Sequence, residues 1–300
     1  MNIVAFLGAI ELGLIFGLIA LAIFLSFRVL DFPDLTVDGS FPLGAAVAAT
    51  MIVAGYDPYF ATFAAIFAGG MAGLVTAFLN LRFKILNLLA SILTMIALYS
   101  INLRIMGRPN VAIITEPTIL TPFEDLGLRA IYLKPLVAGV IAIIVALLVA
   151  RFLNSDYGLA MRATGANQKM SRAQGINTAR TTYVGMALSN ALVGLAGAIF
   201  AQMNGFADIT IGTGTIVVGL AALIAGEALF PARGMLMAVF ACLIGSVLYR
   251  IAIAFALNAD SIGLQASDLN LVTAVLVTAA LVLPGSKNPL KRLLSKGGSK

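Results

Sequence analysis

The chain has 300 residues, of which 61% are hydrophobic and only 11% are charged. Because an average soluble domain carries about 25% charged residues, this composition excludes an ordinary soluble protein and predicts an all-α, polytopic membrane protein. The sequence contains no histidine and one cysteine, Cys242, which excludes disulfides within the chain and histidine-based catalysis or metal binding. The net charge of +6 comes from short loops and the C-terminal tail, so it indicates membrane topology rather than binding of nucleic acid.

Nine apolar runs are long enough to cross a bilayer, some of them as broken helices. In chain order they are 3–27, 40–55, 58–79, 85–103, 132–153, 182–203, 213–229, 234–257 and 268–284. Basic residues concentrate on the cytoplasmic side when the N-terminus is placed outside, as the positive-inside rule requires. We therefore predict one transmembrane domain, 1–284, followed by a basic cytoplasmic tail, 285–300.

The longest segment on the outer side of the membrane in this topology is 104–131, which contains three prolines and three acidic residues. Two interpretations of this outside loop stay open. It is either a simple connector between helices or a landing surface for an extracytoplasmic protein.

Two short segments share the order Asp, aliphatic, Thr, aliphatic, followed by a glycine turn. The first, 34–39, precedes the span 40–55 from the cytoplasmic side in the predicted topology. The second, 208–214, leads into the span 213–229 from the outside. The two copies therefore approach the membrane from opposite faces, as expected for an inverted repeat.

The inverted repeat would relate two four-helix halves, 3–103 and 182–284, with 132–153 as one extra helix. Inverted repeats with interrupted helices are typical of transporters, whose substrate site lies at the breaks. The alternative is that each Asp-x-Thr only caps the helix that follows it, and capping and lining a path are compatible. The residues predicted to line a substrate path are Asp34, Thr36, Asp38, Asp208, Thr210 and Thr213.

Charged residues inside or beside the predicted spans need a partner or access to water. Glu11 and Arg250 both fall in the outer halves of their spans, where they either form a buried pair or extend separately to the interface. Glu227 and Arg233 lie at one cytoplasmic turn, where we expect a surface ion pair.

The polar segment, residues 154–181, is the longest water-compatible stretch between apolar runs and carries four basic residues against one acid. We predict two short helices in it, each with a capping residue and a glycine stop. These are 157–163, with Asp156 and Gly165, and 168–174, with Asn167 and Gly175. A solvated loop and a docking element for a cytosolic partner both fit, and the two tight caps favour the docking element.

The polar segment resembles the cytoplasmic loop of bacterial ABC importer permeases, in the branch that serves branched-chain amino acids, ribose and related solutes. The resemblance rests on Tyr157-Gly158-Leu159-Ala160-Met161-Arg162-Ala163-Thr164-Gly165 and on Ala173-Gln174-Gly175-Ile176-Asn177. The stretch 187–198 is also similar to the next span of that family. The resemblance implies an ATPase-docking loop formed by Tyr157, Gly158, Arg162, Ala163, Gly165, Arg172, Gly175, Ile176 and Asn177.

The chain departs from the family pattern at two places. Relatives carry an Asn and a His-Gly in the broken second helix, whereas 34–39 here reads Asp-Leu-Thr-Val-Asp-Gly. This variant is similar to a sub-branch that handles aromatic amino acids. Glu227 also stands where relatives tend to have glycine.

The resemblance implies a permease subunit of the bacterial inner membrane that pairs with a second permease copy. Separate ATPase subunits would dock on the polar segments, and an extracytoplasmic binding protein would deliver a small solute such as an amino acid. The chain has no Gly-x-x-x-x-Gly-Lys-Ser/Thr loop, so we expect it to bind no cofactor and to leave the use of ATP to its partner.

Two other classes of membrane protein are alternatives to the importer subunit. An ion-coupled secondary transporter would need carboxylates deep in the bilayer, for which Glu11 is a candidate. An intramembrane enzyme is disfavoured, because no nucleophile–base pair or metal-binding cluster occurs at a plausible spacing.

Overall fold

The computed structural model describes residues 3–124, 130–230, 234–257 and 278. The fold is mostly helical, as predicted, with one small sheet that the sequence did not indicate. In chain order the elements are α1 (Ile3–Ile23), the π-helix η1 (Phe24–Val29), α2 (Val37–Val53), α3 (Pro58–Phe83), α4 (Asn87–Met106), β1 (Asn110–Ala112), α5 (Thr121–Glu124), α6 (Ala130–Leu153), α7 (Asp156–Ala166), α8 (Gln168–Ala173), α9 (Thr178–Asn204), β2 (Phe206–Asp208), α10 (Thr215–Leu229) and α11 (Met235–Leu257).

Eight of the nine predicted spans are helices in the described part of the chain. Six helical stretches are long and apolar enough to cross a membrane, while α2 and α10 are shorter, with 17 and 15 residues. The ninth predicted span, 268–284, lies outside the described residues apart from Thr278, and the tail 285–300 lies outside them entirely. The count of nine helices and the four-plus-four repeat therefore stay predictions.

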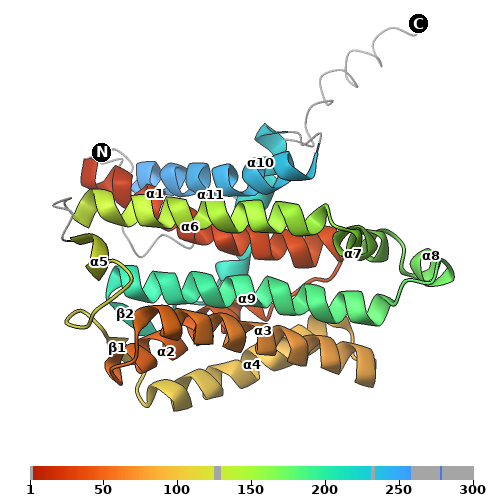
Figure 1. The fold of residues 1–300 in the computed structure, drawn as a ribbon, viewed down its shortest axis with the longest axis horizontal. Helices are drawn as coiled ribbons and strands as arrows, with labels where there is room; N and C mark the ends of the chain where they lie inside the picture. The colour runs from red at the N-terminus through yellow and green to blue at the C-terminus, as the bar shows by residue number, and fades with distance from the viewer. Residues whose placement is uncertain (1–2, 125–129, 231–233, 258–277, 279–300) are drawn as a thin grey trace, which may run out of the picture.

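The long helices lie side by side in one bundle (Figure 1). α9 packs against α3, α2 and α1, and α1 in turn packs against α11 and α6. α7 and α8 lie at one end of the bundle, and β1, β2 and α5 lie at the other (Figure 1). In the predicted topology these two ends are the cytoplasmic and the outer face.

The outward faces of the bundle are apolar. Phe63 and Phe67 on α3 are 67% and 66% exposed, and Leu148 on α6 is 62% exposed. Large exposed apolar surfaces are unusual on soluble proteins, and such side chains are stable when they face lipid. This surface agrees with a multi-pass membrane protein.

Glycines let α2, α3 and α9 approach one another at backbone distance. A Cβ atom at Gly44 on α2 would overlap the carbonyl oxygen of Gly194 on α9. A Cβ atom at Gly73 on α3 would overlap the carbonyl oxygen of Met186 on α9. Small residues at such crossings are the usual means of packing helices inside a membrane.

α2 and α10 start inside the bundle, each after a non-helical segment, and their first turns meet. The Asp38 carboxylate, in the first turn of α2, accepts hydrogen bonds from the backbone N–H groups of Gly214 (3.1 Å) and Ile216 (2.8 Å). A carboxylate at a helix N-terminus satisfies free N–H groups and the helix dipole. Asp38 therefore caps α10 and not the helix that carries it.

The small sheet joins the outer loop to the segment before α10. β1 and β2 pair antiparallel, with Asn110 opposite Asp208. The pairing extends beyond the strands, because the N–H of Ile209 donates to the Pro109 carbonyl oxygen at 3.1 Å. The predicted outside loop, 104–131, is thus attached to the non-helical segment that precedes α10.

Of the two alternatives for Glu11 and Arg250, the buried pair does not form. The guanidinium carbon of Arg250 lies 3.8 Å from the centroid of the Phe16 ring, which is a cation–π geometry. The cation whose charge acts on Glu11 is Lys134 on α6. Among the described residues the only ion pair joins Arg28 and Glu227.

Candidate functional site

α7 opens the polar segment, and its boundaries differ from the prediction. The hydroxyl oxygen of Ser155 accepts from the N–H of Gly158 at 3.3 Å, so Ser155 is the N-cap and Asp156 lies in the first turn. Gly165 does not stop the helix, which continues to Ala166. A Cβ atom at Gly165 would overlap the carbonyl oxygen of Val29, so this glycine allows α7 to lie against the end of η1.

α8 is built as the sequence predicted, although it ends one residue earlier. The side chain of Asn167 caps it by accepting from the N–H of Met170 at 3.0 Å. Gly175 has φ of +82°, in the left-handed region that favours glycine, and its N–H donates to the Arg172 carbonyl oxygen at 3.0 Å. The glycine stop is confirmed.

The polar segment is fixed to the start of α9 by side-chain hydrogen bonds. The hydroxyl of Tyr157 donates to the Arg180 carbonyl oxygen at 3.1 Å, and Arg172 Nε donates to Thr178 Oγ1 at 2.7 Å. Asn177 caps α9 by accepting from the N–H of Arg180 at 3.1 Å. Residues predicted for docking are thus brought together in one ordered unit.

The remaining residues predicted for docking pack within this unit, close a turn in it or line a cavity beside it. A Cβ atom at Gly158 would overlap the Phe152 carbonyl oxygen, so Gly158 holds α7 close to the end of α6. The N–H of Ile176 donates to the Ser171 carbonyl oxygen at 3.0 Å, closing the turn after α8. Ala163 lines the cavity described next.

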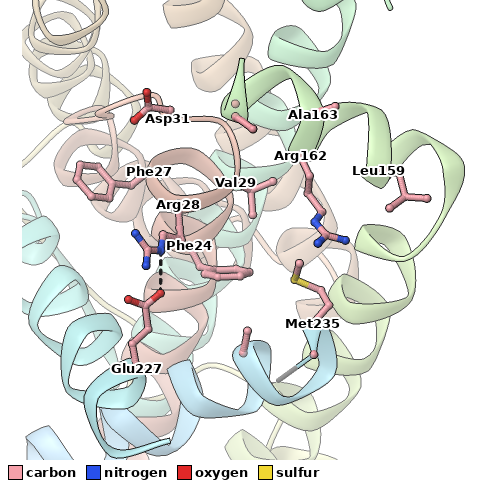
Figure 2. A pocket seen from close by; sticks show the side chains of 14 residues that line it. Phe24, Phe27, Arg28, Val29, Asp31, Leu159, Arg162, Ala163, Glu227 and Met235 are labelled. Atoms are coloured by element: carbon pink, nitrogen blue, oxygen red, sulfur yellow. Dashed lines mark hydrogen bonds and ion pairs between the residues drawn. The ribbon is translucent and has the colours of Figure 1, made fainter. Parts of the chain in front are cut away.

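A cavity of about 830 Å³ lies between α7, the end of η1, the end of α10 and the start of α11 (Figure 2). Charged side chains of both signs line it: Arg28, Asp31, Arg162 and Glu227. A second cavity of about 770 Å³, on the side of the α3–α4 turn, is lined by Arg172 and Lys84, among others. Gly165 borders both, so the end of α7 separates the two cavities.

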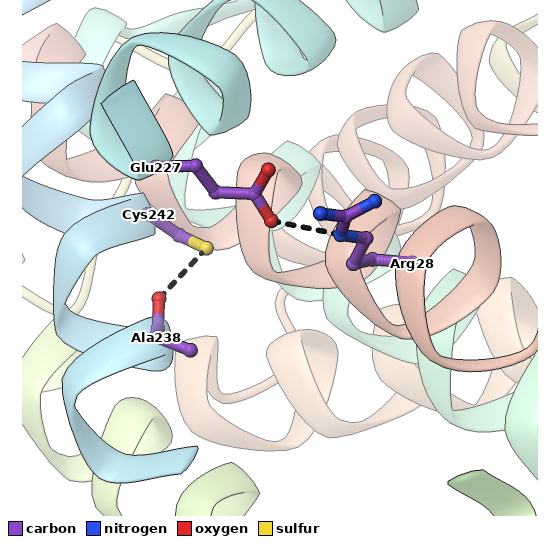
Figure 3. Close-up of polar contacts among 4 residues, drawn as sticks. All are labelled: Arg28, Glu227, Ala238 and Cys242. Atoms are coloured by element: carbon purple, nitrogen blue, oxygen red, sulfur yellow. Dashed lines mark hydrogen bonds and ion pairs between the residues drawn. The ribbon is translucent and has the colours of Figure 1, made fainter. Parts of the chain in front are cut away.

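Glu227 is paired across the first cavity with Arg28. Arg28 Nε donates to Glu227 Oε1 at 3.0 Å, joining η1 to α10 (Figure 3). The predicted partner, Arg233, lies outside the described residues. On α11, the Cys242 thiol donates to the Ala238 carbonyl oxygen at 3.1 Å (Figure 3).

The Arg28–Glu227 pair is expected to contribute little to stability. Both side chains are partly solvated, with 61% and 33% exposed, and such pairs contribute roughly 0–1 kcal/mol. Glu227→Ala should therefore lower the free energy of unfolding by less than about 1 kcal/mol. Gly226→Ala should cost about 1–3 kcal/mol, because its Cβ atom would overlap the Ala241 carbonyl oxygen.

Denaturant titration of the two purified variants would compare these effects. A larger loss for Glu227→Ala than for Gly226→Ala would contradict the view that close packing, and not the ion pair, holds α10 in place.

The predicted path residues at the start of α2 fall into two groups, one buried against α3 and α9 and one that lines a cavity. Asp34 and Thr36 are buried behind α2: Asp34 Oδ1 accepts from the N–H of Thr36 at 2.9 Å, and Asp34 Oδ2 accepts from Asn190 Nδ2 at 2.7 Å. The hydroxyls of Thr36 and Thr76 are 2.7 Å apart. Asp34 and Thr36 therefore fix the start of α2 against α3 and α9.

Asp38, Thr210 and Thr213 are brought together in one cavity of about 400 Å³. The first turn of α2 and the C-terminal half of α4, which contributes Asn102, also line it. This cavity, here called the break cavity, brings together residues of the two sequence copies, which lie in different halves of the chain.

Asp208 lies beside the break cavity, on β2. It accepts from the N–H and the hydroxyl of Thr210 at 2.8 and 2.6 Å, and from Asn110 Nδ2 at 3.1 Å. Partial burial raises the pKa of the Asp208 carboxyl, but the hydrogen bonds from Thr210 and Asn110 outweigh that effect and hold the pKa below its usual value. Asp208 stays ionised and orients Thr210.

The sequence reasoning missed three polar residues inside apolar runs. Asn190 on α9 links Asp34 to Ser40, whose hydroxyl donates to Asn190 Oδ1 at 2.7 Å. Asn102 on α4 is fully buried, and its Nδ2 donates to the Gly39 carbonyl oxygen at 3.2 Å. A polar side chain within an apolar span was the available signal, because such residues are costly unless they have a role.

Comparison with known proteins places these features in a family. The family described as branched-chain amino acid transport system / permease component matches residues 5–283. The tyrosine transport system permease protein of Clostridioides difficile (strain R20291) is 36% identical over 285 residues, covering 95% of this chain and 92% of the relative. An uncharacterized protein of Rickettsia prowazekii (strain Madrid E) is 36% identical over 277 residues, covering 91% of this chain and 95% of the relative.

A solved structure shares the fold. The structure of PsaBC from Streptococcus pneumoniae in complex with Fab has a TM-score of 0.53 and 15% sequence identity, covering 98% of this chain and 94% of that chain. At this identity the likeness concerns the arrangement of helices alone.

Proposed function

Because the chain belongs to the family of permease components of branched-chain amino acid transport systems, we propose that it is the membrane subunit of an ABC importer that moves an amino acid into the bacterial cell across the inner membrane. The observation that carries this proposal is the polar segment. Two capped helices, anchored to α9 and to η1, form an ordered basic unit at one end of the bundle.

A separate ATPase subunit would dock on α7 and α8. The cavities on either side of Gly165 supply charged and apolar surface for it, with Arg162 in one and Arg172 in the other. Because α7 touches the carbonyl of Val29 and Tyr157 is bonded to the start of α9, a displacement of the polar segment would reach two transmembrane helices directly. ATP would be used by the partner, and this chain supplies the path.

The outer partners follow from the same family membership. An extracytoplasmic binding protein would deliver the solute to the end that carries β1, β2 and α5, and a second permease copy would complete the path. The tyrosine permease relative supports an amino acid as solute, in agreement with the sub-branch that the segment 34–39 resembles.

Charge reversal at Arg162 is the direct test. Arg162→Glu is expected to reduce recovery of the ATPase and ATP-dependent uptake by at least about tenfold, because like charges placed across an interface cost several kcal/mol. The chain would be purified gently from its native membrane, its partners identified by mass spectrometry, and uptake measured in liposomes. Arg104→Glu, at the opposite end of the bundle, is the matched control and should behave as wild type.

An ion-coupled secondary transporter is the second candidate, and the observation that favours it is the buried carboxylate of Asp34 at the first break. It predicts a different result in the same experiment. Recovery of the chain without an ATPase, together with solute uptake driven by an ion gradient alone, would replace the importer by this alternative.

A further inference from the structure

We infer that the second cavity, between the α3–α4 turn and the polar segment, binds the phosphate headgroup of an anionic phospholipid. The cavity has a volume of about 770 Å³ and lies at the end of the bundle that carries α7 and α8 (Figure 1). A bilayer surrounds this chain whether or not an ATPase binds it, so the site would exist in the proposed importer and in the ion-coupled alternative alike. Three features point to it: the charge of the cavity, the order of its walls and the apolar surface beside it.

The lining of the second cavity carries more positive than negative charge. Its cations are Lys84 in the α3–α4 turn and Lys169 and Arg172 in the polar segment, against one carboxylate, that of Asp31. None of the three cations is ion-paired within the described part of the chain. Charges of one sign that line a cleft reinforce one another and raise the local concentration of counter-ions. The cavity therefore favours an anionic ligand over a neutral or cationic one.

The walls that carry these cations are held in place by hydrogen bonds. Arg172 Nε donates to Thr178 Oγ1 at 2.7 Å, which orients the guanidinium and leaves its two terminal amino groups for a ligand. In the α3–α4 turn, Asn80 Nδ2 donates to the Ile85 carbonyl oxygen at 2.8 Å and to Asn87 Oδ1 at 2.6 Å. Because both walls are ordered before a ligand arrives, binding costs less conformational entropy.

Lys84 ends α3 in a conformation that lysine rarely adopts. Its φ is +57°, in the left-handed region, where glycine is the usual residue at a helix end. Lysine at this position places a cation in the turn where glycine would place none. α4 then begins without a side-chain cap at Leu86, so its first N–H groups add partial positive charge to the same wall. The side-chain cations attract the anion, and the start of α4 adds to their effect.

Large apolar side chains are exposed on both sides of Lys84. Phe83 is 61% exposed and Leu86 is 76% exposed, and the exposed Leu88 and Leu89 continue this surface along the first turn of α4. Apolar patches of this kind are unusual in water, and acyl chains would cover them. A lysine between them can lay its apolar stem along the chains and extend its ammonium group to the headgroups. The turn therefore lies where acyl chains give way to headgroups.

The basic cavity and the apolar turn together distinguish an anionic phospholipid from other ligands. Inorganic phosphate would satisfy the cations but would leave Phe83 and Leu86 in water. An acidic loop of the proposed ATPase could reach Lys169 and Arg172 from the cytosol, but not the apolar turn. A zwitterionic lipid would bring a second cation into a cavity that is already positive. In the predicted topology the bound lipid belongs to the cytoplasmic leaflet, where basic pockets between helices bind anionic headgroups.

Quenching of tryptophan fluorescence by brominated lipids, with the full-length chain in vesicles, tests the inference. The chain contains no tryptophan, so Phe83→Trp supplies a single reporter beside the cavity, and Leu86→Trp supplies a second one. In mixed vesicles both should report a binding constant for phosphatidylglycerol at least about tenfold above that for phosphatidylcholine, because each surface cation contributes about fivefold. Phe63→Trp, near the opposite end of α3, is the matched control and should show no preference.

Charge removal in the Phe83→Trp chain locates the headgroup. Lys84→Gln and Lys169→Gln should each lower the preference for phosphatidylglycerol by about fivefold. Arg82→Gln is the matched control, because it removes a positive charge beside the same turn and Arg82 is not among the described residues that line the cavity. An equal loss in Arg82→Gln and Lys84→Gln would show that the general surface potential attracts the lipid, and would overturn the site.

Three further outcomes would overturn the inference. Equal quenching by brominated phosphatidylglycerol and brominated phosphatidylcholine would remove the anionic headgroup. No quenching of Phe83→Trp and Leu86→Trp by either lipid would show that protein, and not lipid, covers the turn. Inorganic phosphate should leave the preference unchanged when it is compared with sodium chloride of equal ionic strength. Loss of the preference in phosphate alone would assign the cavity to a free anion instead of a lipid.

Discussion

Gly165→Ala is expected to abolish ATP-driven uptake while the chain still inserts into the membrane. Gly165 lies inside α7, where helix propensity alone predicts that alanine stabilises the helix by about 1 kcal/mol. Packing predicts the opposite, because the added Cβ would overlap the Val29 carbonyl oxygen and approach the Leu30 carbonyl carbon to 2.9 Å. Backbone atoms cannot yield as a flexible side chain does, so α7 must move away from η1.

The loss of uptake should be at least about tenfold, since displacements of about 1 Å in a coupled site have effects of up to about a hundredfold. Uptake and ATP hydrolysis would be measured together in liposomes. Gly8→Ala is the matched control, because a Cβ atom at Gly8 meets nothing within 4 Å. Coupled uptake in Gly165→Ala would show that contact between α7 and η1 does not transmit motion.

Asn190→Leu is expected to cause the largest loss of stability. The side chain of Asn190 donates to Asp34 Oδ2 at 2.7 Å and accepts from the Ser40 hydroxyl at 2.7 Å. All three residues are at most 2% exposed. Leucine would leave the Asp34 carboxylate and the Ser40 hydroxyl each buried with one partner fewer, and each such loss costs roughly 1–3 kcal/mol, more where the group is charged.

Denaturant titration in detergent micelles would measure this loss. Asn204→Leu is the control on the same helix, because Asn204 Nδ2 donates only to the Phe200 carbonyl oxygen of its own helix. Comparable losses for the two variants would contradict a special role for the network that joins Asp34, Asn190 and Ser40.

Hydropathy was enough to place eight of the nine predicted spans, because each of these apolar runs is long and its ends are marked by polar residues. Local capping chemistry also predicted α8 correctly, from Asn167 to Gly175. It failed at α7, where the cap is Ser155 and not the predicted Asp156, and where Gly165 serves tertiary packing instead of ending the helix. A glycine that ends a helix and a glycine that allows another backbone segment to pack closely against the helix cannot be told apart from the local sequence.

The candidate site was predictable only in part. Asp38, Thr210 and Thr213 were found from the repeated Asp-x-Thr order, and the structure brings them together. No local pattern could show that Asp38 caps α10, because the donor and the acceptor lie in different halves of the chain. The strands β1 and β2 were missed for a similar reason: three residues are too few to show a period of two.

The pairing of β1 with β2 connects the predicted outside loop mechanically to the segment that leads into α10. From the hydrogen bond between Ile209 and Pro109, only a few residues of backbone lead to Gly214, whose N–H is held by Asp38. A displacement of β1 must either pull this segment with it or break its hydrogen bonds. Movement of the predicted outside loop would therefore reach the first turns of α2 and α10 through a few residues of backbone.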